Sequence, residues 1–175
     1  MNSNTEKNDG QASCEYQENV GILRQIDFFS SLPLEATKVF AYLCTRETFR
    51  PGDYLFQQDE EGDRAYYIIS GSARLDRRID DTEKTMRTYT AGAFIGRLAL
   101  MGKMRRLFSL KASTEVTCLI IGREKFTRAL EQFPDIMPKI IKVLVDNIYN
   151  WEKRFLADRS VDGENSFQQI GVSLV

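Results

Sequence analysis

Apolar residues follow two different periods along this chain, and the change between them separates helical segments from strands. An apolar cluster over residues 22–32 is followed, after Pro33, by apolar positions three or four residues apart. The members of this second group are Ala36, Val39, Phe40 and Leu43. Spacing of this kind is typical of one buried helix face, so we expect two short helices before the first strand.

From residue 48 to about residue 121, short β-type runs alternate with clusters of turn residues. These clusters are Pro51-Gly52-Asp53, Glu61-Gly62-Asp63, Ser70-Gly71-Ser72, Asp80-Asp81 and Ala91-Gly92. The spacing predicts six to eight strands in a sandwich or barrel, in which the turn glycines simply serve tight turns. After Gly122 the pattern is helical again and ends in a longer helix that reaches Ala157. The order predicts a mainly β, α+β fold: an antiparallel β-roll or jelly roll with N-terminal helices and a C-terminal helix pair.

The length of 175 residues, of which 42% are hydrophobic, suits one well-cored domain. We expect a polar, disordered tail over residues 1–20, the domain over residues 21–157, and a flexible tail over residues 158–175.

Charge and composition narrow the function. The net charge of −1 and the pI near 5.7 argue against direct DNA binding driven by overall charge. No apolar run has the length of a signal peptide or a membrane span, so we expect a cytoplasmic protein without membrane insertion. Three cysteines at unrelated spacings indicate free thiols rather than a metal site. The chain has no histidine and no catalytic motif, so we expect no enzyme activity, metal or required cofactor.

The segment from Lys84 to Thr114 contains seven Lys or Arg residues and no Asp or Glu. They are Lys84, Arg87, Arg97, Lys103, Arg105, Arg106 and Lys111. Within it, glycines and small residues precede Arg106, whose planar guanidinium suits phosphate oxygens. The segment is thus a candidate anion site, although strand alternation would send some of these side chains to each face and leave them solvated.

Residues 92–112 resemble the phosphate-binding cassette of the cyclic-nucleotide-binding domain family, which runs roughly F-G-E-x-A-L, a short tip, then R-x-x-T/S-V-x-A. Residues 49–63, 65–73 and 120–126 are similar to the opening hairpins, a characteristic strand and the exit from the roll in that family. The resemblance covers residues 22–157. It implies a regulatory β-roll that binds a cyclic nucleotide or another small phosphate-bearing ligand.

The resemblance implies a set of ligand-binding residues: Gly96, Arg97, Leu98, Ala99, Arg106, Leu107 and Ser109. Arg106 takes the place of the phosphate-binding arginine. Arg97 stands where the family has a glutamate that accepts the ribose hydroxyl, and a guanidinium has only donors. Leu107 replaces a small residue beside the phosphate, and we expect it to fill the pocket. We therefore expect weak or no binding of cyclic AMP and cyclic GMP, with Arg97 facing solvent or a different acid.

The last helix has apolar residues at intervals of three, four, three and four: Ile141, Leu144, Ile148, Trp151 and Phe155. This spacing is that of a coiled-coil seam, so we expect a homodimer or a protein partner there. The alternative is that this stripe packs on the roll of its own chain, and the resembled family also uses this helix as a lid over the ligand.

Three functional hypotheses follow. In the first, the chain is a non-enzymatic regulatory or sensory module with a degenerate pocket. In the second, it is a working sensor of a nucleotide or small phosphate ligand and signals through its C-terminal helix. In the third, Leu107 and Phe108 close the pocket and the chain is a dimerisation or protein-interaction scaffold.

Overall fold

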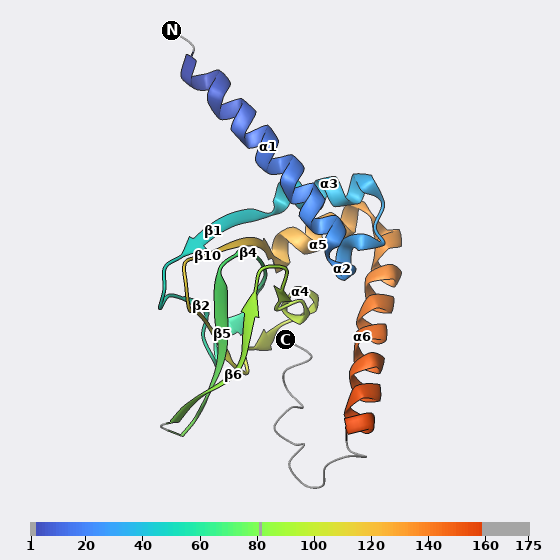
Figure 1. The fold of residues 1–175 in the computed structure, drawn as a ribbon. Coiled ribbons are helices and arrows are strands. Elements are labelled where there is room, and N and C mark those ends of the chain that lie inside the picture. Colours follow the sequence, from blue (N-terminus) through green and yellow to red (C-terminus); the bar gives the residue numbers. More distant parts are fainter. Residues whose placement is uncertain (1–2, 81, 159–175) are drawn as a thin grey trace.

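The computed structural model describes residues 3–80 and 82–158 as a β-roll with helices gathered at one end (Figure 1). One four-stranded antiparallel sheet has the order β1-β10-β4-β7. Its strands are β1 (Thr45–Phe49), β10 (Val116–Gly122), β4 (Arg64–Ser70) and β7 (Phe94–Ile95). The second, of order β2-β9-β5-β6, contains β2 (Tyr54–Phe56), β9 (Ser109–Ala112), β5 (Ser72–Ile79) and β6 (Thr82–Thr90). A separate short pair joins β3 (Glu61–Gly62) to β8 (Met104–Arg105).

The strands form because alternate side chains are apolar and meet inside the roll. On β5, Ala73 and Leu75 are fully buried, whereas Arg74 between them is only half-buried. Facing residues from the other strands complete the core: Ile68, Ile95, Leu110 and Val116. The predicted fold class is confirmed. The described part of the chain has ten strands rather than six to eight, because β3, β7 and β8 have two residues each and are too short to show a period.

The helices come from both ends of the sequence and share a second core. Before the roll lie α1 (Ser3–Gln25), α2 (Asp27–Ser30) and α3 (Leu34–Leu43). After it lie α5 (Arg123–Gln132), a 3₁₀ turn (Pro134–Ile136) and α6 (Met137–Asp158). Five phenylalanine rings from these segments and β7 pack with centroids 5.0–6.5 Å apart: Phe28, Phe29, Phe40, Phe94 and Phe126. These rings join the helices to β7, which lies near the start of the cassette.

The N-terminal segment differs from our expectation. We predicted a disordered tail over residues 1–20, but the structure has the helix α1 from Ser3 to Gln25. Leu23 is buried, and Arg46 of β1 donates hydrogen bonds to Asn19 Oδ1 (2.9 and 2.7 Å) and to Glu18 Oε2 (3.0 Å). These bonds join residues 27 or 28 positions apart, so no local pattern reveals them. The flexible tail predicted after Asp158 falls on residues 159–175, outside the described residues.

The three cysteines, Cys14, Cys44 and Cys118, are free thiols, as the sequence indicates. Burial raises the pKa of Cys44 and the pKa of Cys118 to about 12. The thiolate is the reactive form of cysteine, so the raised pKa values disfavour reaction at these two side chains.

Arg46→Ala should lower the free energy of unfolding by about 1–3 kcal/mol, because it leaves the buried amide of Asn19 without its charged partner. Urea denaturation measures the change. Arg128→Ala is the control, since Arg128 forms only an exposed pair with Glu124 on the same helix. An Arg46 variant as stable as this control would show that α1 is not anchored to β1.

Candidate anion site around Arg106

Arg106 lies directly after β8 and is 5% exposed, and it is the only buried lysine or arginine in the part of the chain that the structure describes. The pairing of β8 with β3 continues through the backbone of Arg106. Its N–H donates to Glu60 O (2.9 Å), and its carbonyl oxygen accepts a hydrogen bond from Asp59 N–H (2.8 Å). These bonds fix the backbone from which the arginine side chain enters the protein. Leu107, the next residue, is 63% exposed.

Two glycines make room for the guanidinium. A Cβ atom on Gly62 would lie 2.7 Å from Arg106 Nε, and one on Gly96 would lie 2.7 Å from Nη1. The guanidinium carbon is 4.2 Å from the centroid of the Phe56 ring, a distance typical of a cation–π contact. Arg106 Nη2 donates a hydrogen bond to Arg64 O at 2.5 Å. The cation is therefore held by β2, β3, β4 and the start of the cassette.

The charge of Arg106 has no acid paired with it. Among the described residues no carboxylate lies within 4.0 Å of its nitrogens, and its buried Nε has no hydrogen-bond partner. Burial lowers the pKa of Arg106, an effect that Tyr66, Asp63 and Glu60 oppose and Arg123 reinforces. Arginine nevertheless stays protonated in proteins. A buried cation without an acid is costly, and an anion bound there would offset that cost.

Tyr66 cannot neutralise Arg106 at neutral pH. Its hydroxyl donates a hydrogen bond to Leu55 O at 2.8 Å. Burial raises the pKa of Tyr66 to about 12, against a smaller lowering by Arg106. The phenol therefore remains uncharged beside the guanidinium.

Of the predicted ligand-binding residues, the structure brings Gly96 and Ala99 together with Arg106. Gly96 has φ +85°, a conformation that favours glycine, and Ala99 is fully buried. Leu98 begins the four-residue helix α4 (Leu98–Met101). Ala99 N–H donates to Gly96 O (3.0 Å) and Leu100 N–H to Arg97 O (3.2 Å). The N–H groups of Ala99 and Leu100 are thus used within this turn and are not free to bind a ligand.

Arg97 belongs to a different environment. Burial lowers the pKa of its guanidinium, and the charges that act on it most strongly are those of Asp27 in α2 and Tyr89 in β6. Asp27 raises the pKa of Arg97 and so stabilises its charged form. The residue that stands in the place of the family glutamate thus interacts electrostatically with the N-terminal helices.

Leu107 and Ser109 differ from our expectation. Leu107 is too exposed to fill a buried pocket, whereas Phe108 is buried as part of the roll core. The Ser109 hydroxyl oxygen accepts a hydrogen bond from Gln58 N–H at 2.9 Å, which ties β9 to the loop after β2. Leu107 therefore does not take the buried position that we expected for it.

The sequence-local excess of basic residues does not form one site. Arg87 lies over the Tyr89 ring (5.1 Å), Lys111 over the Tyr54 ring (4.8 Å), and Arg105 donates to Asp59 O (3.2 Å). Arg87, Lys111 and Arg105 belong to different strands. The candidate anion site is therefore confined to the surroundings of Arg106.

Sequence reasoning missed three residues that shape this site: Phe56, Gly62 and Arg123. We interpreted Gly62 as a turn glycine, but it lies in β3 without a left-handed φ, and its missing side chain makes space for Arg106. Arg123 begins α5 and donates from Nη2 to Gly62 O at 3.1 Å. Three long-range strand pairings bring these residues together: β3–β8 places Gly62, β2–β9 places Phe56, and β4–β10 places Arg123 next to the register pair Gly122–Arg64. The local sequence carries no signal for these pairings.

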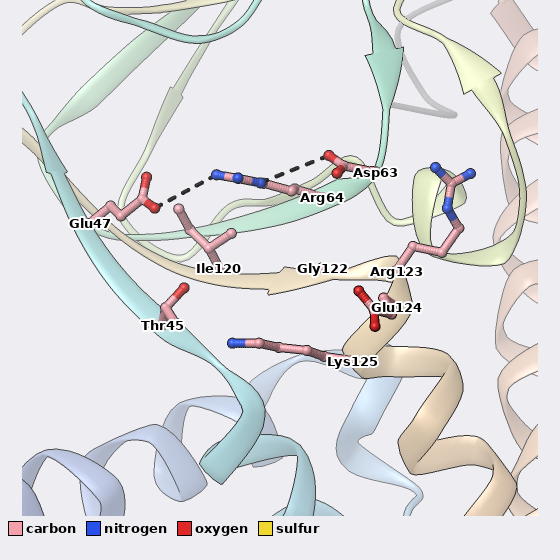
Figure 2. A pocket seen from close by; sticks show the side chains of 9 residues that line it. All are labelled: Thr45, Glu47, Asp63, Arg64, Ile120, Gly122, Arg123, Glu124 and Lys125. Atoms are coloured by element: carbon pink, nitrogen blue, oxygen red, sulfur yellow. Dashed lines mark ion pairs between the residues drawn. The ribbon is translucent and has the colours of Figure 1, made fainter.

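A pocket of about 350 Å³ adjoins this region (Figure 2). The residues that line it are Thr45, Glu47, Asp63, Arg64, Ile120, Gly122, Arg123, Glu124 and Lys125. The Arg64 side chain spans Glu47 (3.7 Å) and Asp63 (3.9 Å), while its backbone oxygen accepts the bond from Arg106. Both ion pairs are exposed and contribute little energy, so this pocket is a weaker candidate than Arg106.

An antiparallel β-roll with helices before and after it, and a buried arginine on its cassette, defines a ligand-binding module. Residues 46–133, half of the chain, match the family model of the cyclic nucleotide-binding domain, and the chain belongs to this family. The resemblance inferred from the sequence is confirmed.

Relatives and solved structures agree with this assignment. The cAMP-dependent protein kinase regulatory subunit of Emericella nidulans is 33% identical over 116 residues, which are 66% of this chain and 27% of that protein. A cyclic nucleotide-binding-like protein from Brucella abortus is 31% identical with a TM-score of 0.61, over 65% of this chain and 98% of the other. The regulatory subunit of a cAMP-independent protein kinase A from Trypanosoma brucei is 27% identical with a TM-score of 0.60, over 74% of this chain and 48% of the other. This chain spans about a quarter of the length of the first relative.

No group of three or more cysteine, aspartate or glutamate side chains in the described residues has the arrangement of a metal site. No helix in the same residues combines the length and the apolar character that a bilayer crossing requires.

Gly96→Ala should destabilise the protein more than Gly92→Ala, by about 1–3 kcal/mol. Both glycines have a left-handed φ, +85° and +92°, but a Cβ on Gly92 meets nothing within 4 Å. A Cβ on Gly96 would lie 2.9 Å from Arg64 O and 2.7 Å from Arg106 Nη1. Thermal and urea denaturation of the two variants separate the cost of the backbone conformation from the cost of displacing Arg106. Equal losses would show that Arg106 does not depend on the space at Gly96.

Proposed function

We propose that this chain is a non-enzymatic regulatory module that binds a phosphate-bearing ligand at Arg106 and binds cyclic AMP and cyclic GMP weakly or not at all. The observation that carries the proposal is the buried guanidinium of Arg106, which has an unpartnered Nε and no paired carboxylate in the described residues. An anionic ligand would supply the missing charge and acceptor. The exposure of Leu107 favours an accessible site over a closed scaffold.

Arg97 is the reason to expect weak cyclic nucleotide binding. A glutamate in its place would accept a hydrogen bond from the ribose hydroxyl, whereas a guanidinium has no acceptor. Losing one charge-assisted hydrogen bond costs about 1.5–3 kcal/mol, or roughly ten- to a hundred-fold in affinity. The Trypanosoma brucei relative is named as the regulatory subunit of a cAMP-independent kinase, so this type of domain is compatible with regulation by something other than cyclic AMP.

The regulatory role rests on the connection between the cassette and the helices. Phe94 lies two residues before Gly96 and packs with Phe28 and Phe29 of α2. A ligand that moves Arg106 against Gly96 would therefore act on the helical end of the molecule. The three free thiols fit a reducing compartment, and we place the protein in the cytoplasm.

Calorimetry with the unmodified protein should give no measurable binding, or only weak binding, for cyclic AMP and cyclic GMP. Arg97→Glu should raise the affinity for both by about ten- to a hundred-fold, because it restores a carboxylate acceptor. Adding Leu107→Ala should change the affinity little further, because the Leu107 side chain is exposed and does not fill the site. Lys103→Glu, an equal charge change at an exposed residue, is the control and should not restore binding. Micromolar or tighter binding of cyclic AMP by the unmodified protein would contradict the proposal.

A second candidate function, homodimerisation through α6, rests on an exposed apolar stripe. Ile141, Val145, Ile148 and Tyr149 are 39–62% exposed, and they lie on one face of a helix that extends away from the rest of the protein (Figure 1). This stripe is shifted from the predicted seam, because Leu144 is half-buried against the helical core of its own chain. The side chains of Trp151 and Phe155 lie outside the described residues.

The double variant Ile141→Asp, Ile148→Asp should convert a dimer to a monomer in sedimentation velocity at micromolar concentration, because two charges would have to enter an apolar interface. Lys142→Asp on the same helix is the control, since Lys142 is well exposed and pairs only with Asp146. A monomeric unmodified protein at high micromolar concentration would exclude this candidate.

A further inference from the structure

Three buried side-chain nitrogens in the described residues have no hydrogen-bond partner: Arg106 Nε, Arg123 Nη1 and Asn147 Nδ2. Two of the three are guanidinium nitrogens. Buried donors are nearly always paired in proteins, so two unpaired donors on neighbouring cations require an explanation.

The two arginines meet at Gly62. On one side, Arg106 Nε lies 2.7 Å from the position that a Gly62 Cβ would take. On the other, Arg123 Nη2 donates to Gly62 O at 3.1 Å. The Arg123 side chain is 18% exposed, and its backbone N–H donates to Asp63 O at 2.6 Å. Figure 2 shows its guanidinium projecting from the start of α5, away from Lys125.

The acids near this pair compensate it incompletely. Arg123 Nη2 is 3.4 Å from Glu61 Oε1, but that glutamate is 61% exposed, and such pairs contribute little. Asp63 and Glu60 act on Arg106 only through their fields, and Tyr66 is uncharged. Arg123 itself lowers the pKa of Arg106, which shows that the two cations repel each other.

We propose that Arg123 is a second cation of the Arg106 site, and that this site prefers a dianionic phosphate monoester to a singly charged cyclic phosphodiester. The proposal rests on the proposed function, since Arg106 is common to both. A phosphate monoester carries close to two negative charges at neutral pH and three strong acceptor oxygens, so it can compensate two guanidinium groups. A cyclic phosphodiester carries one charge and leaves one of the two cations uncompensated.

The test compares 5′-AMP with cyclic AMP, which share the base and the sugar, and includes inorganic phosphate as the smallest probe. In calorimetry at pH 7.5, AMP should bind at least tenfold more tightly than cyclic AMP. Lowering the pH to 5.5 should weaken AMP binding about fourfold, because the second phosphate pKa is near 6, and should leave cyclic AMP unchanged. The chain has no histidine, and the other side-chain types titrate outside this range in model compounds, so such a change reports the ligand.

Arg123→Gln should lower the affinity for AMP roughly ten- to thirtyfold and change that for cyclic AMP less than twofold, because it removes one charge and keeps a polar side chain. Arg128→Gln, on the same helix but exposed, is the matched control and should change neither. Arg106→Ala should weaken binding of both. If Arg123→Gln does not fold, Glu61→Gln tests the same point, since removing the competing carboxylate should strengthen AMP binding more than cyclic AMP binding.

The outcomes separate the two proposals. If Arg123→Gln changes the affinities for AMP and cyclic AMP equally, or changes neither, the proposal that Arg123 is a second cation of the site is wrong. The proposed role of Arg106 would remain intact. If neither AMP, cyclic AMP nor inorganic phosphate binds, or if Arg106→Ala changes nothing, both proposals fail.

Discussion

The burial of the Arg106 charge without a paired acid is the constraint on which the rest of the site depends. Desolvating a guanidinium costs several kcal/mol, so its surroundings must hold it closely. Gly62 and Gly96 supply space, Phe56 supplies the face of its ring, and Arg64 supplies one backbone oxygen. None of these contacts carries a full negative charge. The fold therefore holds a buried cation whose charge no acid among the described residues pairs with.

The same constraint connects the cassette to the helices. Gly96 is in contact distance of Arg106 and follows β7, whose Phe94 packs in the aromatic cluster with Phe28 and Phe29. Arg97, on the other side of Gly96, is under the influence of Asp27 at the start of α2. A ligand shifts such a system only if it binds one arrangement more tightly than another. In the function that we propose, an anion bound at Arg106 would shift the helices only by binding more tightly to one of their positions than to another.

The sequence predicted the parts of the fold that have a local period. The order of helices and strands, the family, and Arg106 as the central cation all follow from residue spacing and motif. It did not predict the role of Gly62, because a glycine between two acids is indistinguishable from a turn until β3 is paired with β8. Arg123 was missed because it reaches Gly62 only once β10 is paired with β4, where Gly122 faces Arg64. The helix α1 depends on hydrogen bonds between Asn19 and Arg46, which are far apart in the sequence. The exposure of Leu107 depends on the direction that the chain takes after Arg106.

The change of glutamate to Arg97 alters more than one hydrogen bond. A carboxylate on the cassette would serve both as a ribose acceptor and as a counter-charge near Arg106. Its absence makes the site more positive, because Arg106 and Arg123 then share only the exposed Glu61 and the more distant fields of Asp63 and Glu60. A singly charged cyclic ligand thus loses an acceptor, while a more highly charged anion gains from the uncompensated cations. In the function that we propose, Arg97 therefore both disfavours cyclic nucleotides and shifts selectivity toward ligands of higher charge.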